Sequence, residues 1–264
     1  MIKLVAIDLD GTLFDSKSKI SQKNIKAIND CLARGIRVVI TTAKTVYWVK
    51  KLITELDLKD PQIASAGAAI IDSNLNPIFI KKIPQSSFRR MVKLSRKYGV
   101  GFGASCLDGY VYYENDNPDL RYIWESGERP KFISNLLDSR VLNQVLLVTV
   151  TVDPEHIFNE VFRKEMDGKV KIRRGGRYFL AAYNKNTGKT PALKKILKNL
   201  GIKNREIMAI GDSESDLGMI ELAGTGVAMG NAPENVKAAA DFVVKDNDSN
   251  GVAEAIEKFI LKQY

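Results

Sequence analysis

The sequence predicts an α/β fold, with a Rossmann-like parallel sheet that carries helices on both faces and a smaller inserted α/β module. Two observations support this prediction. Strand and helix patterns alternate over residues 1–65, and two apolar runs far apart in the chain each end in acidic residues. Alternating strand and helix units form parallel sheets, whose active sites lie beyond the carboxyl ends of the strands. We therefore expect the two acidic strand ends to meet at one edge of the sheet.

The alternation starts at the first residues of the sequence. Apolar, β-branched runs and helical periodicity predict strands at 2–7, 36–40 and 62–65 and helices at 21–34 and 45–56. Residues 68–83 resemble a hairpin, because two apolar runs flank a turn rich in Asp, Asn, Ser and Pro.

The middle of the chain repeats strand and helix patterns without an acidic strand end. The patterns predict helices at 85–98 and 154–166 and strands at 110–114, 146–152, 169–173 and 177–183. We interpret this region as a separate α/β module.

The first acidic strand end holds Asp8 and Asp10, followed at once by Gly11 and Thr12. Side chains two residues apart in a strand point the same way, so the two carboxylates leave the strand end as a pair. Two like charges side by side are unfavourable unless a positive group lies near them. A divalent metal with phosphate chemistry would account for the pair. The alternative is an ordinary strand that runs into an Asp-Gly turn.

Three further segments carry polar groups at comparable places. The apolar run 206–210 ends in Gly211 and Asp212, with Asp216 four residues later, and this second acidic end suggests one shared site of the kind Mg²⁺ prefers. The run 36–40 ends in Thr41-Thr42-Ala43-Lys44. Lys189 precedes an amphipathic stretch, which places it at a helix N-terminus, a favourable position for an anion. Taken singly, these residues could be helix caps or a solvated lysine.

These four segments, in this order, closely resemble the four motifs of the haloacid dehalogenase-like (HAD) superfamily of phosphatases and phosphotransferases. Segments 226–232, 240–244 and 248–253 look like its Cof-type branch. The resemblance covers roughly residues 1–80 and 185–264. The long insert between the second and third motifs resembles a C2 cap, and its mixed pattern suggests the C2B subtype. The resemblance implies a core domain of residues 1–81 and 187–264 and a cap domain of residues 82–186.

The resemblance implies a Mg²⁺-dependent phosphatase that hydrolyses a small phosphorylated metabolite, of the sugar phosphate or phosphoglycolate type, through an aspartyl-phosphate. Asp8 would be the nucleophile, and Asp10 would act as general acid and then as general base. Mg²⁺ would be held by the Asp8 side chain, the Asp10 backbone carbonyl and the Asp212 side chain. Asp216 would be a further ligand or would orient the ligands.

The resemblance also implies a set of phosphate or substrate contacts, which are made by the Thr42 side chain, the amides of Leu9 and Ala43, Lys189 and Ser215. Three positions depart from the usual Cof-type pattern. Lys44 stands where that pattern often has arginine, while Ala66 and Ser215 each stand where it often has asparagine. Lysine keeps the charge of arginine but loses its bidentate fork. None of the three departures affects Asp8, Asp10, Lys189 or Asp212.

Two alternatives to a phosphatase stay open. The first is a phosphomannomutase-like phosphotransferase, which shares the fold and cap type. The second is a non-catalytic basic protein on a HAD scaffold that binds nucleic acid, because the net charge is +9. The basic residues are dispersed, however, so we expect no nucleic-acid partner. The densest stretch, 169–177, alternates with apolar residues, and we slightly favour a solvated strand face for it.

The expected location is the cytoplasm, and no membrane association is expected. No apolar stretch approaches the roughly 20 residues of a membrane span. No export leader precedes the first predicted strand, and the two cysteines form no C-x-x-C pair. The partner that the resemblance implies is a small phosphorylated metabolite.

Overall fold

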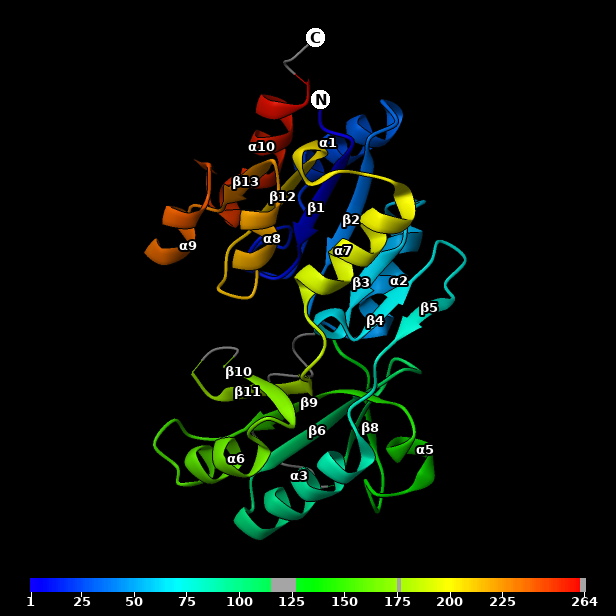
Figure 1. Cartoon of the computed structure of the whole chain (residues 1–264), viewed down its shortest axis with the longest axis vertical. Helices are drawn as coiled ribbons and strands as arrows, with labels where there is room; N and C mark the ends of the chain where they lie inside the picture. Colours follow the sequence, from blue (N-terminus) through cyan, green and yellow to red (C-terminus); the bar gives the residue numbers. More distant parts are fainter. Residues whose placement is uncertain (115–126, 175–176, 262–264) are drawn as a thin grey trace.

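The computed structural model describes residues 1–114, 127–174 and 177–261, and it contains two β-sheets with helices packed against them (Figure 1). The first sheet has eight strands in the order β14-β13-β12-β1-β2-β3-β4-β5, and the second has six in the order β10-β11-β9-β6-β7-β8. The predicted α/β fold class is confirmed.

The first sheet is formed by the two ends of the chain. Its strands are β1 (Leu4–Asp8), β2 (Arg37–Thr41), β3 (Gln62–Ala64), β4 (Ala69–Ile71), β5 (Pro77–Ile80), β12 (Ile207–Gly211), β13 (Thr225–Ala228) and β14 (Phe242–Val243). The six strands from β14 to β3 run parallel, and β4 and β5 add the predicted hairpin in antiparallel pairing. The carboxyl ends of β1, β2 and β12 therefore meet at one edge.

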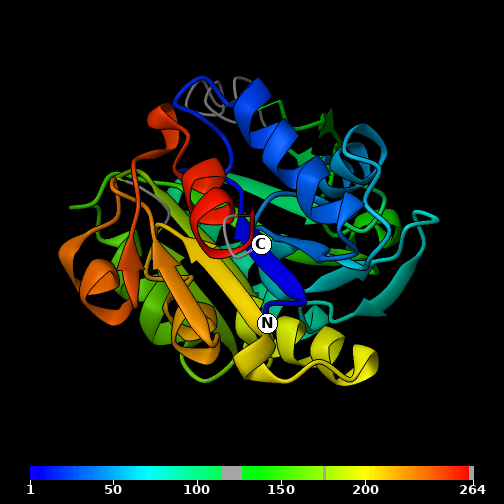
Figure 2. The same ribbon diagram turned by 90° about the horizontal axis from the view of Figure 1, so that it is seen from above.

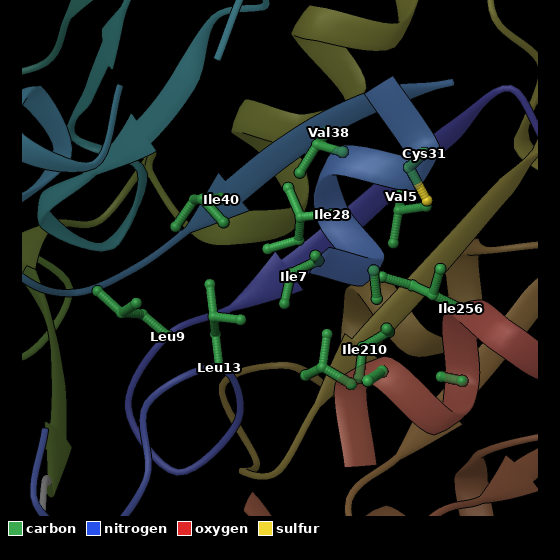
Figure 3. Close-up of a cluster of buried hydrophobic side chains, with 14 of the residues drawn as sticks. Val5, Ile7, Leu9, Leu13, Ile28, Cys31, Val38, Ile40, Ile210 and Ile256 are labelled. Atoms are coloured by element: carbon green, nitrogen blue, oxygen red, sulfur yellow. The ribbon is translucent and has the colours of Figure 1, made fainter. Parts of the chain in front are cut away.

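Helices cover both faces of this sheet (Figure 2). They are α1 (Gln22–Ala33), α2 (Val46–Glu55), α7 (Lys189–Leu200), α8 (Leu217–Leu222), α9 (Glu234–Ala239) and α10 (Gly251–Phe259). Alternate side chains of β1 face opposite ways. Ile7 packs in one buried cluster with Ile28 of α1 and Ile256 of α10 (Figure 3). Ala6 packs on the other face with Leu193 of α7.

The second sheet is mostly antiparallel, with one parallel pair, β7 and β8. Its strands are β6 (Gly101–Cys106), β7 (Val111–Tyr113), β8 (Pro130–Phe132), β9 (Val145–Thr151), β10 (Val170–Arg174) and β11 (Phe179–Asn184). The helices α3 (Gln85–Tyr98), α5 (Ser139–Leu142) and α6 (Phe158–Met166) pack around one apolar core with this sheet. Figure 1 shows α3 and α6 on the side away from the first sheet.

This region differs from the sequence prediction in several details: β8 and α5 were not predicted, and two further differences have a clear physical reason. Strand β6 was not predicted, because Gly101–Cys106 is rich in small residues and lacks the β-branched pattern of a strand. Glycine is nonetheless required at Gly103, where a Cβ would lie 2.5 Å from the Tyr113 ring. Helix α6 starts at Phe158 rather than near 154, because the Asp153 carboxylate accepts the Glu155 N–H and holds a turn before the helix.

Two chain crossings, near residues 80–85 and 184–189, connect the sheets. The Asn184 side chain donates a hydrogen bond to the Lys82 carbonyl at 2.7 Å, and the Thr187 hydroxyl donates to the Asn184 carbonyl at 2.7 Å. The two crossings are therefore tied to each other beside the start of α7. Within the described ranges, no helix has both the length and the apolar character that a membrane span requires.

Candidate active site

A cavity of about 1110 Å³ lies between the carboxyl ends of the first sheet and the second sheet. Six of the predicted site residues line it: Asp8, Asp10, Ala43, Lys189, Asp212 and Ser215. The chain positions of these residues span almost the whole sequence, so the fold brings them together as the parallel strand order predicts. Leu9, Thr42 and Asp216 lie behind the cavity wall and are fully buried.

The turn after β1 is tight and depends on a glycine. The Leu9 carbonyl accepts the N–H groups of Thr12 and Phe14, and Gly11 has φ +79°. A Cβ on Gly11 would lie 2.4 Å from Asp212 Oδ2. The Asn231 side chain donates to the Gly11 carbonyl at 2.8 Å. Glycine is required here both by the backbone conformation and by the close approach of the Asp212 carboxylate.

Lys189, the first residue of α7, joins two of the carboxylates. Its Nζ donates to Asp8 Oδ1 at 2.5 Å and to Asp216 Oδ1 at 2.7 Å, and all three side chains are buried. Burial lowers the pKa of Lys189, but the two carboxylates outweigh it and raise that pKa above its ordinary value. Lys189 is therefore a permanent cation. Burial and repulsion from Asp216 raise the pKa of Asp8, while Lys189 opposes them.

Asp216 holds the loop that follows β12. Its Oδ2 accepts the backbone N–H groups of Asp212 at 3.3 Å and Ser213 at 3.1 Å, and also the Ser213 hydroxyl at 2.8 Å. Since Oδ1 accepts from Lys189, both oxygens already have donors. A Cβ on Gly211 would lie 2.4 Å from the Asp216 Cβ, so this loop also needs a glycine.

Asp8, Asp212 and Asp216 offer oxygen atoms that all lie within 4.8 Å of one another. Thr12 donates its hydroxyl to Asp212 Oδ1 at 2.8 Å, which fixes the orientation of that carboxylate. Burial raises the pKa of Asp212, and repulsion from Asp216 adds to the effect. Three carboxylates and one lysine leave an excess of negative charge, and an all-oxygen donor set suits a hard divalent cation. The residues therefore fit a divalent metal, which the family generally uses.

Lys44, one of the three departures, is placed against Asp10. Its Nζ lies 3.3 Å from Asp10 Oδ1 and 5.1 Å from the centre of the Trp48 ring. The stem of Lys44 is buried although the Asp10 side chain is about half exposed, at 53%. A cation at this position holds the Asp10 carboxylate at the cavity mouth.

Thr42, the expected phosphate contact, directly follows β2, and its phosphate role stays a prediction. Its side chain is fully buried and accepts the Lys44 N–H at 3.0 Å, so the hydroxyl shapes the loop after β2. The Thr42 carbonyl accepts the N–H of Ala66, a non-glycine residue with φ +54°. The next residue, Gly67, has φ +85°, and a Cβ there would lie 2.2 Å from the Gly188 carbonyl oxygen. This left-handed turn therefore packs directly against the residue before Lys189.

Sequence reasoning missed Glu128, which lies just before β8. Glu128 lines the cavity and accepts the Thr45 hydroxyl at 2.6 Å. Burial raises the pKa of Glu128 above its ordinary value. Glu128 belongs to no motif and lies far along the chain from Thr45, so no local pattern could have found it. The roles of Thr12 and Asn231 were also missed, although Thr12 stands within the first motif.

Comparisons with known proteins agree with this geometry. A profile of the haloacid dehalogenase-like hydrolases matches residues 5–256. The 5-amino-6-(5-phospho-D-ribitylamino)uracil phosphatase YcsE of Bacillus subtilis is 33% identical over 98% of this chain and 96% of its own length. The phosphatase YwtE of the same organism, named for the same substrate, is 30% identical over the whole of both chains.

A solved structure gives the same result for the fold. The crystal structure of a haloacid dehalogenase-like hydrolase from Bacteroides thetaiotaomicron matches with a TM-score of 0.91 and 28% identity, over 98% of this chain and all of the other. The chain belongs to the haloacid dehalogenase-like hydrolases, in their Cof-type branch, and is a phosphoric monoester hydrolase.

Replacement of Gly11 by alanine is expected to lower kcat/KM roughly 10²-fold, because displacement of a reacting group by about 1 Å has an effect of that size. The new Cβ would collide with the Asp212 carboxylate. Gly35→Ala is a matched control, since Gly35 has φ +73° and nothing lies within 4 Å of its Cβ position. Gly35→Ala should lose about 1 kcal/mol of stability, and Gly11→Ala should lose more, because its new Cβ also meets the Asp212 carboxylate. Equal kcat/KM in the two variants would contradict the positional role of Gly11.

Proposed function

We propose that the protein is a Mg²⁺-dependent phosphatase that cleaves a small phosphorylated metabolite through an aspartyl-phosphate on Asp8. The observation that supports this most directly is the buried contact between Asp8 and Lys189 at the cavity wall. A carboxylate is a weak nucleophile in water, but here it is held in one orientation by a permanent cation. That cation also faces the space where a phosphoryl group would lose its leaving group.

In the proposed first step, the Asp8 oxygen that Lys189 does not bind attacks phosphorus. The new O–P bond forms as the bond from phosphorus to the substrate oxygen breaks. Asp10, two residues further along and at the cavity, donates a proton to the leaving alkoxide. In the second step Asp10 takes a proton from water, which attacks phosphorus and releases Asp8 and inorganic phosphate. The contact with Lys44 keeps Asp10 within reach during both steps.

The proposed metal ligands are the side chains of Asp8 and Asp212 and the backbone carbonyl of Asp10. When bound, Mg²⁺ would offset the charge of the phosphoryl group. Asp216 already receives four hydrogen bonds, so we assign it the orienting role rather than that of a ligand. Thr12 orients Asp212 in the same way, through its hydroxyl. We propose that residues 82–186 act as a cap over this site.

Metal dependence tests the proposal. Phosphate release from p-nitrophenyl phosphate and a panel of phosphorylated metabolites should be lost in EDTA and restored by Mg²⁺. The panel should include 5-amino-6-(5-phospho-D-ribitylamino)uracil, because two relatives are named for it. Mg²⁺ at 100 times its Kd should add about 2.7 kcal/mol of stability, seen as a higher Tm. In Asp212→Asn both the activity and the Tm increase should disappear. Full activity in EDTA would contradict the metal assignment.

The two alternatives are less well supported. A phosphomannomutase-like enzyme would convert a sugar phosphate into its isomer without net phosphate release, whereas the relatives named above are phosphatases. A nucleic-acid-binding protein would need neither a carboxylate cluster nor a buried lysine, and this chain keeps both. Measurement of isomer formation beside phosphate release separates the mutase from the phosphatase.

A further inference from the structure

The face of the second sheet opposite α3 and α6 forms one wall of the cavity, and strand register fixes which side chains it carries. Lys171 of β10 lies opposite Tyr183 of β11, and Arg173 lies opposite Ala181. Directly opposed residues of an antiparallel pair share a face. Ile172, which lies between the two basic residues, packs against the apolar core shared with α3 and α6, so Lys171 and Arg173 face the other way and belong to the inner face that lines the cavity. Arg173 is exposed and Lys171 is half-buried, so this basic stretch is a solvated strand face as interpreted, and at these two residues that face also lines the cavity.

Lys171 lies beside the start of α7. Its Nζ donates to the Thr187 carbonyl at 3.1 Å, and Thr187 is two residues before Lys189. Arg173 lies two residues further along β10, about 7 Å away. In the described part of the chain, no carboxylate lies within ion-pairing distance of either side chain. These two cations, which have no acidic partner among the described residues, therefore follow one strand away from the catalytic lysine.

The other end of the same wall has the opposite character. Tyr113 of β7 lies four strands from β10, about 19 Å across the sheet. It is buried at the cavity, and its hydroxyl has no hydrogen-bond partner among the described residues. The Glu128 carboxylate lines the cavity near Asp10 and Lys44. An anionic group inside the cavity would thus be repelled from the Glu128 end and attracted to β10.

The middle of the wall leaves room for a substrate between these ends. In the row that contains Arg173, the next two positions are Ala181 of β11 and Thr149 of β9, which are small side chains. Both residues line the cavity. A molecule bound at Asp8 can therefore reach Arg173 across β9 and β11 without meeting a large side chain in that row.

We propose that Lys171 and Arg173 form a second anion subsite, and that the preferred substrate is a phosphomonoester with another anionic group remote from the scissile phosphate. The second group is a carboxylate or a phosphate, as in phosphorylated sugar acids and sugar bisphosphates. This inference rests on the proposed function, because it takes the scissile phosphate to bind at Asp8. The subsite would select one class of phosphomonoester, whereas the catalytic residues alone would act on any phosphomonoester that reaches Asp8.

A matched pair of substrates tests the subsite. 6-Phosphogluconate and sorbitol 6-phosphate share a six-carbon phosphorylated chain and differ only in a distal carboxylate against a distal hydroxymethyl group. For the wild type, kcat/KM should favour the carboxylate at least roughly tenfold, the effect of one hydrogen-bonded charge pair. Arg173→Gln and Lys171→Gln should each reduce this ratio several-fold. Higher salt should reduce it as well.

Lys169→Gln is the matched control, because Lys169 is exposed, donates to the Glu165 carbonyl and lies outside the cavity lining. It should leave the ratio at the wild-type value. A wild-type ratio near one would overturn the subsite, and so would a ratio that Arg173→Gln does not change. Either result would leave the phosphatase proposal standing, provided that both substrates are hydrolysed.

Binding separates failure of the subsite from failure of the proposed chemistry. Calorimetric titration of Asp8→Asn, which should bind without turnover, gives the affinity ratio of the two compounds directly. A ratio of at least roughly tenfold that falls in Asp8→Asn/Arg173→Gln supports the subsite even if the wild type releases no phosphate. Equal affinities for the two compounds overturn it.

Discussion

Replacement of Asp8 by asparagine is expected to lower kcat by on the order of 10⁴-fold or more, because removal of a nucleophile leaves only binding and electrostatic contributions. The variant should nevertheless fold. Asparagine has nearly the same shape and can still accept the hydrogen bond from Lys189 Nζ. It also removes one of three carboxylates that lie within 4.8 Å of one another. We expect the Tm in metal-free buffer to equal or exceed that of the wild type, as is common where function and stability conflict.

The measurement combines steady-state phosphate release with thermal unfolding of the same preparations. Asp30→Asn is a suitable control, because Asp30 pairs with Lys26 on the exposed side of α1, far from the cavity. It should keep full activity and change stability by no more than about 0.5 kcal/mol. An Asp8→Asn protein that turns over at more than a tenth of the wild-type rate would remove Asp8 from the nucleophile role.

The first sheet could be predicted closely because its strands show strong local signals. The run ahead of Asp8 is apolar and β-branched, and buried parallel strands have that composition. The polar residues at the strand ends were also expected to lie close together, because parallel strands have their carboxyl ends at the same edge of the sheet. Local pattern and global topology agree in this part of the chain, so the strand-end residues that line the cavity could be named before the structure was known.

The second sheet was harder to predict because its residues are determined by contacts with parts of the chain that are distant in sequence. Strand β6 is rich in small residues whose positions are set by their neighbours, as the Tyr113 ring over Gly103 illustrates. The contact between Glu128 and Thr45 joins residues 83 positions apart, and no spacing rule links them. Arg173 has the alternation of a solvated strand, and only the pairing of β10 with β11 identifies the side of the sheet it faces. A proposed specificity residue of this kind can be identified only from the register of the paired strands, because no sequence motif marks it.

Replacement of the buried Lys189 is expected to have the second large effect, on both stability and activity. Lys189→Met should lower the free energy of unfolding by about 3–5 kcal/mol, because it leaves the buried carboxylates of Asp8 and Asp216 without their cation. For a chain of this length the loss corresponds to a fall in Tm on the order of 10 °C. Activity should fall by at least about 10³-fold, since the charge that faces the transferring phosphoryl group is also lost.

A double variant separates these two consequences. In Lys189→Met/Asp216→Asn one unpaired carboxylate is removed, so part of the lost stability should return, whereas the activity should not. The coupling between the two sites should be about 1–3 kcal/mol, because they share one ion-paired network. Lys194→Met on the exposed side of α7 is the control and should change neither quantity appreciably. Strictly additive effects at Lys189 and Asp216 would mean that the lysine stabilises the fold by packing alone. Recovery of stability without recovery of activity would show that Lys189 has two roles. It stabilises the buried carboxylates of Asp8 and Asp216 in the folded protein, and it also acts on the substrate.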